Sequence, residues 1–230
     1  MVHIYDYPRP AVTVDCVVFG LDQTHYLQVL LIQRRLPPFK GQWALPGGFV
    51  RPNEALEEAA RRELQEETDV TGLCLEQLQT YGQPDRDPRG HTVTVAFYAL
   101  GNLWDYHIKA ATDAKEARWW PMKQLPDLAF DHGLIVQDAI ATLRTTIRHK
   151  PIGFELLPTK FTLTQLQRLY EIVLARPFDK RNFRKKLLKL DILISLDEKE
   201  TNVPHRAAQL YQFDRTKYME RQKTGFNFDL

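Results

Sequence analysis

The chain has little cysteine and no long apolar run. Its 230 residues include two cysteines, Cys16 and Cys74, which do not form a CxxC pair. A disulfide framework and a zinc site are therefore not expected, and small buried hydrophobic residues are the simpler interpretation. No apolar stretch approaches the ~18 residues of a membrane helix, and residues 1–14 lack the pattern of a secretory leader. We expect a soluble, cytoplasmic protein.

The charge is distributed unevenly along the chain. Hydrophobic residues make up 43% and charged residues 26%, which is ordinary for a globular protein and argues against general disorder. Residues 1–150 hold 16 Lys and Arg against 19 Asp and Glu, a net charge of −3. Residues 151–230 hold 15 against 10, a net charge of +5. This asymmetry is a hint that the second part meets an anionic partner.

The order of elements predicts an α+β protein. Asn53 is a suitable N-cap for a helix over residues 54–67, and apolar residues recur at helical spacing over residues 133–148. Strands are predicted where β-branched and aromatic residues are dense, over residues 11–20, 25–34 and 91–100, the first two forming a pair. Strand, helix and strand in this order indicate a mixed sheet with helices packed on it.

Residues 149–160 are the best candidate for a domain boundary, because they combine two prolines with a glycine. A chain of this length is long enough for two modest domains. We expect a first domain over residues 1–150 and a second over residues 151–230.

Three carboxylates recur at helical spacing in GGFVRPNEALEEAARRELQEETDV, residues 47–70. Glu63, Glu66 and Glu67 are related by i,i+3 and i,i+4, so they lie on roughly one face of a helical turn. Their mutual repulsion is relieved by a hard divalent cation such as Mg²⁺, which takes oxygen ligands. A solvated helix held by Glu–Arg ion pairs is the alternative for these carboxylates alone. Gly47 and Gly48, just before the helix, let the backbone approach a phosphate or a metal closely.

The complete pattern resembles the Nudix box. Gly48 is followed after five residues by Glu54, and after seven more by Arg62-Glu63-Leu64, one residue, and Glu66-Glu67. The chain is similar to Nudix proteins over about residues 8–145. The resemblance implies an α/β/α sandwich that acts on a nucleoside diphosphate linked to another moiety.

The resemblance also implies roles for the acidic helix. Glu63, Glu66 and Glu67 would bind Mg²⁺, one of them would help to activate water, and Arg62 would orient the cluster by salt bridging. Water would then attack a diphosphate phosphorus while the metal polarises the phosphoryl oxygens. Asp69 stands where the family usually has Gly, at the helix exit, and Asp tolerates the left-handed conformation often needed there.

Two further segments carry residues suited to a phosphate or a base. Arg86 and Arg89, in QPDRDPRG, can fork onto phosphate or ribose oxygens. A polar hairpin in which aspartates balance these arginines is an equal alternative. PFKGQWALPGGFV supplies Phe39, Lys40 and Trp43 for stacking and for phosphate, although such aromatics more often belong to the core. Both segments resemble the ADP-ribose branch of Nudix proteins, which implies ADP-ribose as the ligand.

The second part predicts a basic helix within a winged helix-turn-helix. A helix capped by Thr162 or Thr164 would precede DKRNFRKKLLKL, residues 179–190, which Asp179 can cap, and two short strands would surround the polar insert 197–206. Phe183, Leu187 and Leu190 form a narrow apolar stripe. Cations face the other way, as in a recognition helix or in a generic basic surface helix. The DNA-facing candidates are Lys180, Arg181, Asn182, Arg184 and Lys185.

Nearly the whole chain is similar to the Nudix-related transcriptional regulators of NAD metabolism, through FTLTQLQRLYEIVL, DKRNFRKKLLKL and PHRAAQLYQFDRTKY. The resemblance implies that the Nudix domain senses ADP-ribose and that the winged helix binds double-stranded operator DNA as part of a homodimer. A Mg²⁺-dependent ADP-ribose pyrophosphatase giving AMP and ribose 5-phosphate is the alternative, since the acidic helix is intact. A sugar-sensing regulator is disfavoured, because a ligand without phosphates has no use for that helix.

Overall fold

The computed structural model describes residues 7–22, 26–103, 114–201, 207–223 and 228. The chain divides into two compact units, which are described separately. Residues 1–19, 28–99 and 106–139 form the first unit, and residues 20–27, 100–105 and 140–230 form the second. Within the described ranges, no helix is long and apolar enough to cross a membrane.

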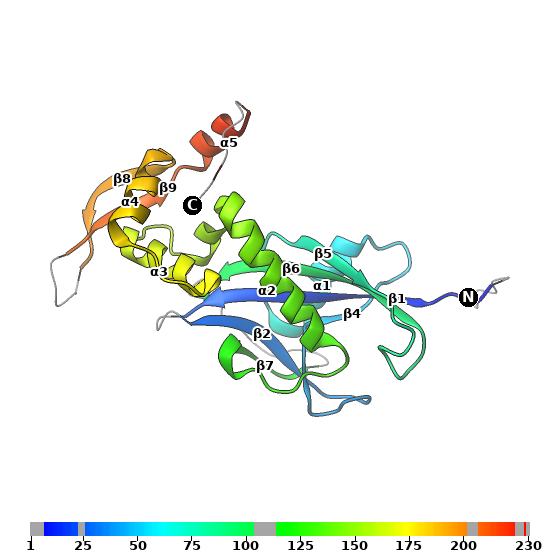
Figure 1. The fold of residues 1–230 in the computed structure, drawn as a ribbon. Coiled ribbons are helices and arrows are strands. Elements are labelled where there is room, and N and C mark those ends of the chain that lie inside the picture. The colour runs from blue at the N-terminus through cyan, green and yellow to red at the C-terminus, as the bar shows by residue number, and fades with distance from the viewer. Residues whose placement is uncertain (1–6, 23–25, 104–113, 202–206, 224–227, 229–230) are drawn as a thin grey trace. The chain divides into compact units, whose positions relative to one another are not determined.

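A mixed sheet organises the first unit (Figure 1). The strand order is β3-β2-β1-β6-β5, with β4 also paired to β1 and β7 to β2. Strands β1 and β6 start side by side, because the Ala11 N–H donates to the His91 carbonyl, so both run the same way. The strands are β1 (Ala11–Leu21), β2 (Leu27–Arg34), β3 (Trp43–Ala44), β4 (Gly47–Phe49), β5 (Glu76–Tyr81), β6 (Thr92–Asn102) and β7 (Ala114–Pro121).

Helix α1 (Leu56–Thr68) covers one face of this sheet, and the first half of α2 (His132–His149) covers the other. Ala59, Ala60 and Leu64 of α1 pack with Val14 and Val95 in one buried cluster. Ile135, Val136 and Ala139 of α2 are also buried. The predicted α/β/α sandwich is confirmed, and so are the three predicted strands in their described parts.

The start of α1 corrects one prediction. Asn53 is not the N-cap, since it adopts a left-handed turn conformation (φ 66°) and the helix begins after Ala55. The Glu58 side chain accepts a hydrogen bond from the Ala55 N–H at 3.2 Å. This is the half of a capping box in which the N3 side chain satisfies the N-cap N–H. The helix exit confirms the other prediction, because Asp69 is left-handed at φ 63° and its N–H donates to the Gln65 carbonyl.

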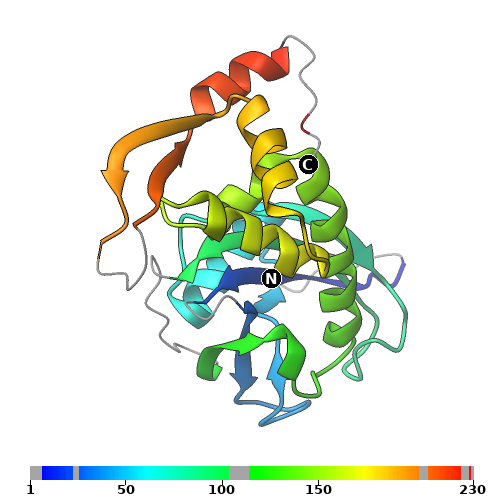
Figure 2. The same cartoon turned by 60° about the vertical axis from the view of Figure 1, so that its left-hand side comes forward.

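The second unit has the order of a winged helix (Figure 2). Thr162 caps α3 by accepting from the Gln165 N–H, and Asp179 caps α4 by accepting from the Asn182 N–H. Phe161 forms a short antiparallel bridge with Tyr211 beside the hairpin. The elements are a 3-10 helix (Pro151–Leu156), α3 (Leu163–Leu174), α4 (Lys180–Lys189), β8 (Leu193–Lys199), β9 (Gln209–Phe213) and α5 (Arg215–Lys223).

The amphipathic prediction for α4 is confirmed. Phe183 and Leu187 are buried and Leu190 is half-buried, as the stripe requires. The ring of Phe183 packs against Tyr170 of α3, with the ring centroids 5.7 Å apart. Burial of this stripe removes apolar surface from water and leaves the charged face of α4 exposed.

Candidate functional site

Arg62 is the centre of an ion-pair network on α1. Its guanidinium donates to both carboxylate oxygens of Glu54, at 2.6 and 2.9 Å, and to Glu63 at 2.6 Å. It also reaches Glu66 at 3.2 Å and the carbonyl of Phe49 at 3.2 Å. The hydrogen bonds from Arg62 lower the pKa of Glu54 to about 2. A guanidinium bound on several sides restricts the orientation of the carboxylates around it, which is the geometry that the predicted role of Arg62 requires.

Glu67 and Glu63 lie against the two glycines of β4. Glu67 is buried and accepts a hydrogen bond from the Gly47 N–H at 2.8 Å. Burial raises the pKa of Glu67 to about 8 and also raises that of Glu63. A Cβ on Gly48 would lie 2.6 Å from Glu63 Oε1, so the absence of a side chain there is what admits this carboxylate.

A pocket of about 460 Å³ opens beside the acidic helix, within the first unit. Glu63 and Glu66 line it together with Gly47 and Gly48, whereas Glu67 is outside the lining and is held by the Gly47 N–H. Its charged lining is mostly cationic, with six arginines against four carboxylates. The arginines are Arg34, Arg35, Arg51, Arg62, Arg86 and Arg89, and the carboxylates are Asp15, Glu63, Glu66 and Asp87. Such a lining favours an anionic ligand.

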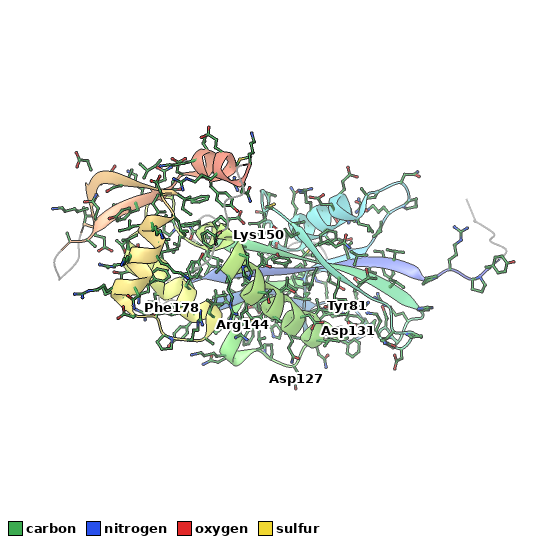
Figure 3. All side chains as sticks on the ribbon, turned by 45° about the horizontal axis from the view of Figure 1, so that its top comes forward. Tyr81, Asp127, Asp131, Arg144, Lys150 and Phe178 are labelled. Carbon is green, nitrogen blue, oxygen red and sulfur yellow. The ribbon has the colours of Figure 1, made fainter. Side chains whose placement is uncertain are left out.

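The predicted residue Arg86 belongs to a largely buried polar cluster at the pocket, and sequence reasoning missed its other members, Asp15, Asp131 and His132. Arg86 binds Asp131 with two hydrogen bonds, at 2.6 and 2.8 Å, and lies 3.5 Å from Asp15. Asp131 directly precedes α2 (Figure 3). A charged residue inside the apolar strand AVTVDCVVFG was the one signal for Asp15. The burial of Arg86, whose side chain is 4% exposed, is balanced by these two carboxylates.

His132 belongs to this cluster and has a defined tautomer. Its Nδ1 accepts from the Leu45 N–H at 2.8 Å, and burial lowers its pKa. A neutral imidazole that accepts at Nδ1 carries its proton on Nε2. That Nε2 lies 3.5 Å from an oxygen of Asp15, and both residues line the pocket. The cluster therefore offers a donor and an acceptor side by side to a ligand hydroxyl.

The loop arginines are both in the pocket, and the hairpin alternative describes part of their contacts. Arg89 binds Asp87, with the shortest distance 2.7 Å, and its guanidinium lies over the ring of Phe49 at 4.9 Å. Arg86 instead reaches Asp131, 45 residues away. Arg89 is the more accessible of the two, since 42% of its side chain is exposed.

Phe39, Lys40 and Trp43 are not brought into the pocket lining. Phe39 packs edge-on against Phe130, with ring centroids 4.8 Å apart, so it supports a lining residue from behind. Trp43 packs against Trp120 at 5.2 Å. Lys40 is exposed. Their ligand-binding role stays a prediction, and Phe39 contacts the lining residue Phe130.

The predicted recognition helix presents most of its candidates to solvent. Lys180, Arg181, Asn182 and Lys185 of α4 are exposed. Arg184 is half-buried and donates to the Thr164 hydroxyl at 2.9 Å. A cleft of about 860 Å³ in the second unit is lined by residues of α3, α4 and the β8-β9 hairpin. Lys180 and Arg184 both line it, so Arg184 points along α3 rather than straight outward.

Two family models match the chain. The NUDIX domain matches residues 9–139, and the NrtR DNA-binding winged helix domain matches residues 153–213. The chain belongs to the NrtR family. The NrtR relative from Acinetobacter baylyi, the ADPR responsive transcriptional repressor NtrR, is 39% identical over 227 residues, 97% of this chain and 87% of the relative.

Other relatives of this NrtR-family chain match one or both units. The crystal structure of Shewanella oneidensis NrtR complexed with a 27mer DNA has a TM-score of 0.79 and 34% identity, covering 95% of this chain and 99% of that one. The NUDIX domain of the same protein complexed with ADP ribose has a TM-score of 0.56 and 38% identity, covering 60% and 94%. The ADP-ribose pyrophosphatase of Methanocaldococcus jannaschii is 43% identical over 132 residues, 57% of this chain and 74% of that one.

Hydrolases related to NrtR proteins through the Nudix domain generally use divalent metal cations. The carboxylate oxygens of Glu63, Glu66 and Glu67 are the ligand type that a hard divalent cation takes. In the part of the chain that the structure describes, however, no three His, Cys, Asp or Glu side chains are grouped to hold a metal ion. Arg62 and the Gly47 N–H hold the carboxylates instead. The residues fit a divalent cation in chemistry, because a carboxylate that accepts a hydrogen bond from Arg62 or from the Gly47 N–H still has oxygen lone pairs for a cation.

Gly48→Ala is expected to displace Glu63 without unfolding the NrtR-family chain. The new methyl would meet the end of a flexible side chain, so we expect the thermal midpoint to change little and the divalent-cation affinity to fall about tenfold, as for a lost charged ligand. Calorimetric titration with Mn²⁺ and thermal unfolding measure both. Gly47→Ala is the contrast, because its methyl would meet the backbone carbonyl of Val14 and cost about 1–3 kcal/mol of stability. Unchanged Mn²⁺ affinity in Gly48→Ala would contradict the role of Glu63.

Proposed function

We propose that this protein is a transcriptional repressor of NAD-metabolism genes whose DNA binding is controlled by ADP-ribose held in its Nudix domain. The observation that carries the proposal is the joining, in one chain, of an arginine-lined pocket beside the Nudix helix and a basic helix in an NrtR winged helix domain. The names of the Acinetobacter repressor and of the two Shewanella complexes support both parts of this proposal, the binding of ADP-ribose and the binding of DNA.

ADP-ribose suits the chemistry of the pocket. Its diphosphate carries the negative charge for which exposed guanidiniums such as that of Arg89 form charge-assisted hydrogen bonds. A ribose offers hydroxyls that can both donate to Asp15 and accept from the Nε2 of His132. Phe49 and Phe130 line the same pocket and offer aromatic faces for the adenine.

Operator DNA is the proposed partner of α4. Arg181 and Asn182 are exposed and can read base edges, whereas Lys180 and Lys185 supply charge for phosphates. A winged helix reads only a few base pairs, so two copies in a homodimer would double the contacts across a pseudo-palindromic operator. For control by ligand, ADP-ribose must bind the DNA-free and DNA-bound states with different affinities.

The test is a titration of the full chain onto labelled duplexes from upstream of its own gene and of NAD-biosynthesis genes, with an unrelated duplex as control. Fluorescence anisotropy is recorded at fixed salt, with and without ADP-ribose, since phosphate contacts make the affinity strongly salt-dependent. Sequence-selective binding that changes with ADP-ribose is the expected result. Equal, weak binding to every duplex would refute the repressor.

A second candidate function is Mg²⁺-dependent hydrolysis of ADP-ribose to AMP and ribose 5-phosphate, which the three intact Nudix carboxylates favour. Bound Mg²⁺ would polarise the phosphoryl oxygens and stabilise the leaving group. Glu63, Glu66 and Glu67 would hold it, and Arg62 would orient Glu63 and Glu66 through its hydrogen bonds. One of these three carboxylates would also help to activate the attacking water, the role that the Nudix resemblance implies.

If the protein hydrolyses ADP-ribose, Glu66→Gln and Glu67→Gln are each expected to lower kcat at least about 100-fold, because a neutral amide neither neutralises the cation nor accepts a proton. AMP release measured by chromatography at saturating Mg²⁺ gives the rate. Glu57→Gln, an exposed carboxylate on the same helix, is the control. A rate that persists in both active-site variants would show that the activity comes from another site or a contaminating enzyme.

A further inference from the structure

Arg51 contacts one of the Nudix carboxylates, Glu66. It is in the turn that leads into α1, its side chain is 60% exposed, and it lines the pocket. Its Nη2 contacts both oxygens of Glu66, at 3.1 and 3.4 Å. Glu66 is thus held by two guanidiniums, since Arg62 also reaches it at 3.2 Å.

The two arginines are held differently. Arg62 is largely buried and fixed by Glu54, Glu63 and the Phe49 carbonyl, so it belongs to the frame of the helix. The side chain of Arg51 is exposed, and its main-chain N–H separately donates to the Glu54 carboxylate at 2.9 Å. Substitution of the Arg51 side chain leaves that backbone hydrogen bond in place, so its charge can be removed without dismantling the network.

We propose that Arg51 is a built-in competitor of the divalent cation: it occupies Glu66, lowers the cation affinity of the acidic helix, and so lets the pocket hold a diphosphate with little turnover. A cation that uses Glu66 must displace this guanidinium and then remain close to its positive charge. A unit charge and a double charge at such short range repel enough, even with the dielectric constant of water, to weaken binding about tenfold.

Weak binding of the cation would suit a protein that senses its ligand. A ligand that is cleaved as fast as it binds reports poorly on its own concentration, whereas a weakly metallated pocket keeps the ligand intact. The arginine that competes with the cation also adds positive charge for the diphosphate, so the same residue would favour binding over hydrolysis. Because this role presupposes the proposed sensing of ADP-ribose, its test is made on the protein without nucleotide or DNA.

The experiment compares Mn²⁺ binding to the ligand-free full chain in the wild type, Arg51→Gln and Arg51→Lys, by the loss of the free Mn²⁺ signal in electron paramagnetic resonance. The Arg51→Gln variant, which removes the charge, is expected to lower the Mn²⁺ Kd about tenfold, and Arg51→Lys, which keeps it, to stay within about twofold of the wild type. Arg61→Gln is a matched control, because Arg61 pairs with Glu57 on the same helix and is 53% exposed.

An Mn²⁺ Kd in Arg51→Gln equal to that of the wild type would overturn the proposal, and so would an equal gain in Arg61→Gln. Absence of Mn²⁺ binding in every variant would overturn it too, since Arg51 would then not be what limits the affinity. The response of wild-type DNA binding to ADP-ribose is measured separately. Failure of that response with a confirmed Mn²⁺ gain would refute the sensor and leave the competition intact.

Discussion

Replacing Arg181 and Arg184 together by alanine is expected to weaken operator binding about 100-fold or more while leaving the affinity for ADP-ribose unchanged. Each well-placed base contact is worth about 1–3 kcal/mol, and each lost phosphate contact also reduces the electrostatic part of the affinity. Arg181 is exposed on α4, and the pocket that we assign to ADP-ribose lies in the other unit. Anisotropy titration onto the operator and calorimetric titration with ADP-ribose measure the two affinities.

A matched control removes two positive charges elsewhere in the same unit. Arg215→Ala with Lys217→Ala removes two of the basic side chains of α5, where Arg215 pairs with Glu155 and Lys217 with Asp191. We expect less than about a fivefold loss of DNA affinity. Arg184→Ala also removes the hydrogen bond to Thr164, so thermal unfolding must accompany the titration. Unaltered DNA binding in the Arg181 and Arg184 variant would refute α4 as the recognition helix and favour a generic basic surface.

Glu67→Gln is expected to stabilise the protein at alkaline pH and to leave its stability unchanged near pH 4. The pKa of Glu67 is about 8 in the folded chain, above the usual value of about 4.3, so the folded state favours the protonated carboxyl. The contribution of Glu67 to the free energy of unfolding is therefore fully present below the unfolded-state pKa, and it is lost as the pH rises from about 4 to about 8. Glutamine stays neutral, and its amide oxygen can still accept from the Gly47 N–H.

The expected gain for Glu67→Gln above pH 8 is up to about 5 kcal/mol in the free energy of unfolding, since each unit of pKa difference is worth about 1.4 kcal/mol. Urea unfolding at pH 4.5 and pH 8.5 measures it, in metal-free buffer. Glu57→Gln, which removes an exposed carboxylate of the same helix, should shift both curves by less than about 0.5 kcal/mol. An equal effect of Glu67→Gln at both pH values would contradict the raised pKa.

Features that depend on neighbours in the chain were predictable from the sequence. The Nudix spacing places three carboxylates and Arg62 on one helix because the helical repeat fixes which residues share a face. The cap Asp179 and the stripe of Phe183 and Leu187 follow from the same local geometry. For α3 the sequence left Thr162 and Thr164 as alternative caps, and the structure decided for Thr162. The N-cap at Asn53 was wrong because the contacts of Glu54 with Arg62 and of Glu58 with Ala55 outweighed the local preference.

The sequence by itself therefore determined the Nudix and winged helix folds, the acidic helix and the basic helix, because each is recognised from the spacing of residues a few positions apart. Only the tertiary structure decided which residues meet in the pocket. Asp15, Arg86 and His132 come from a strand, a loop and a helix, and sheet order brings them together. It likewise set Arg51 against Glu66 and kept Trp43 out of the pocket, since contacts between distant segments depend on packing that local spacing does not encode.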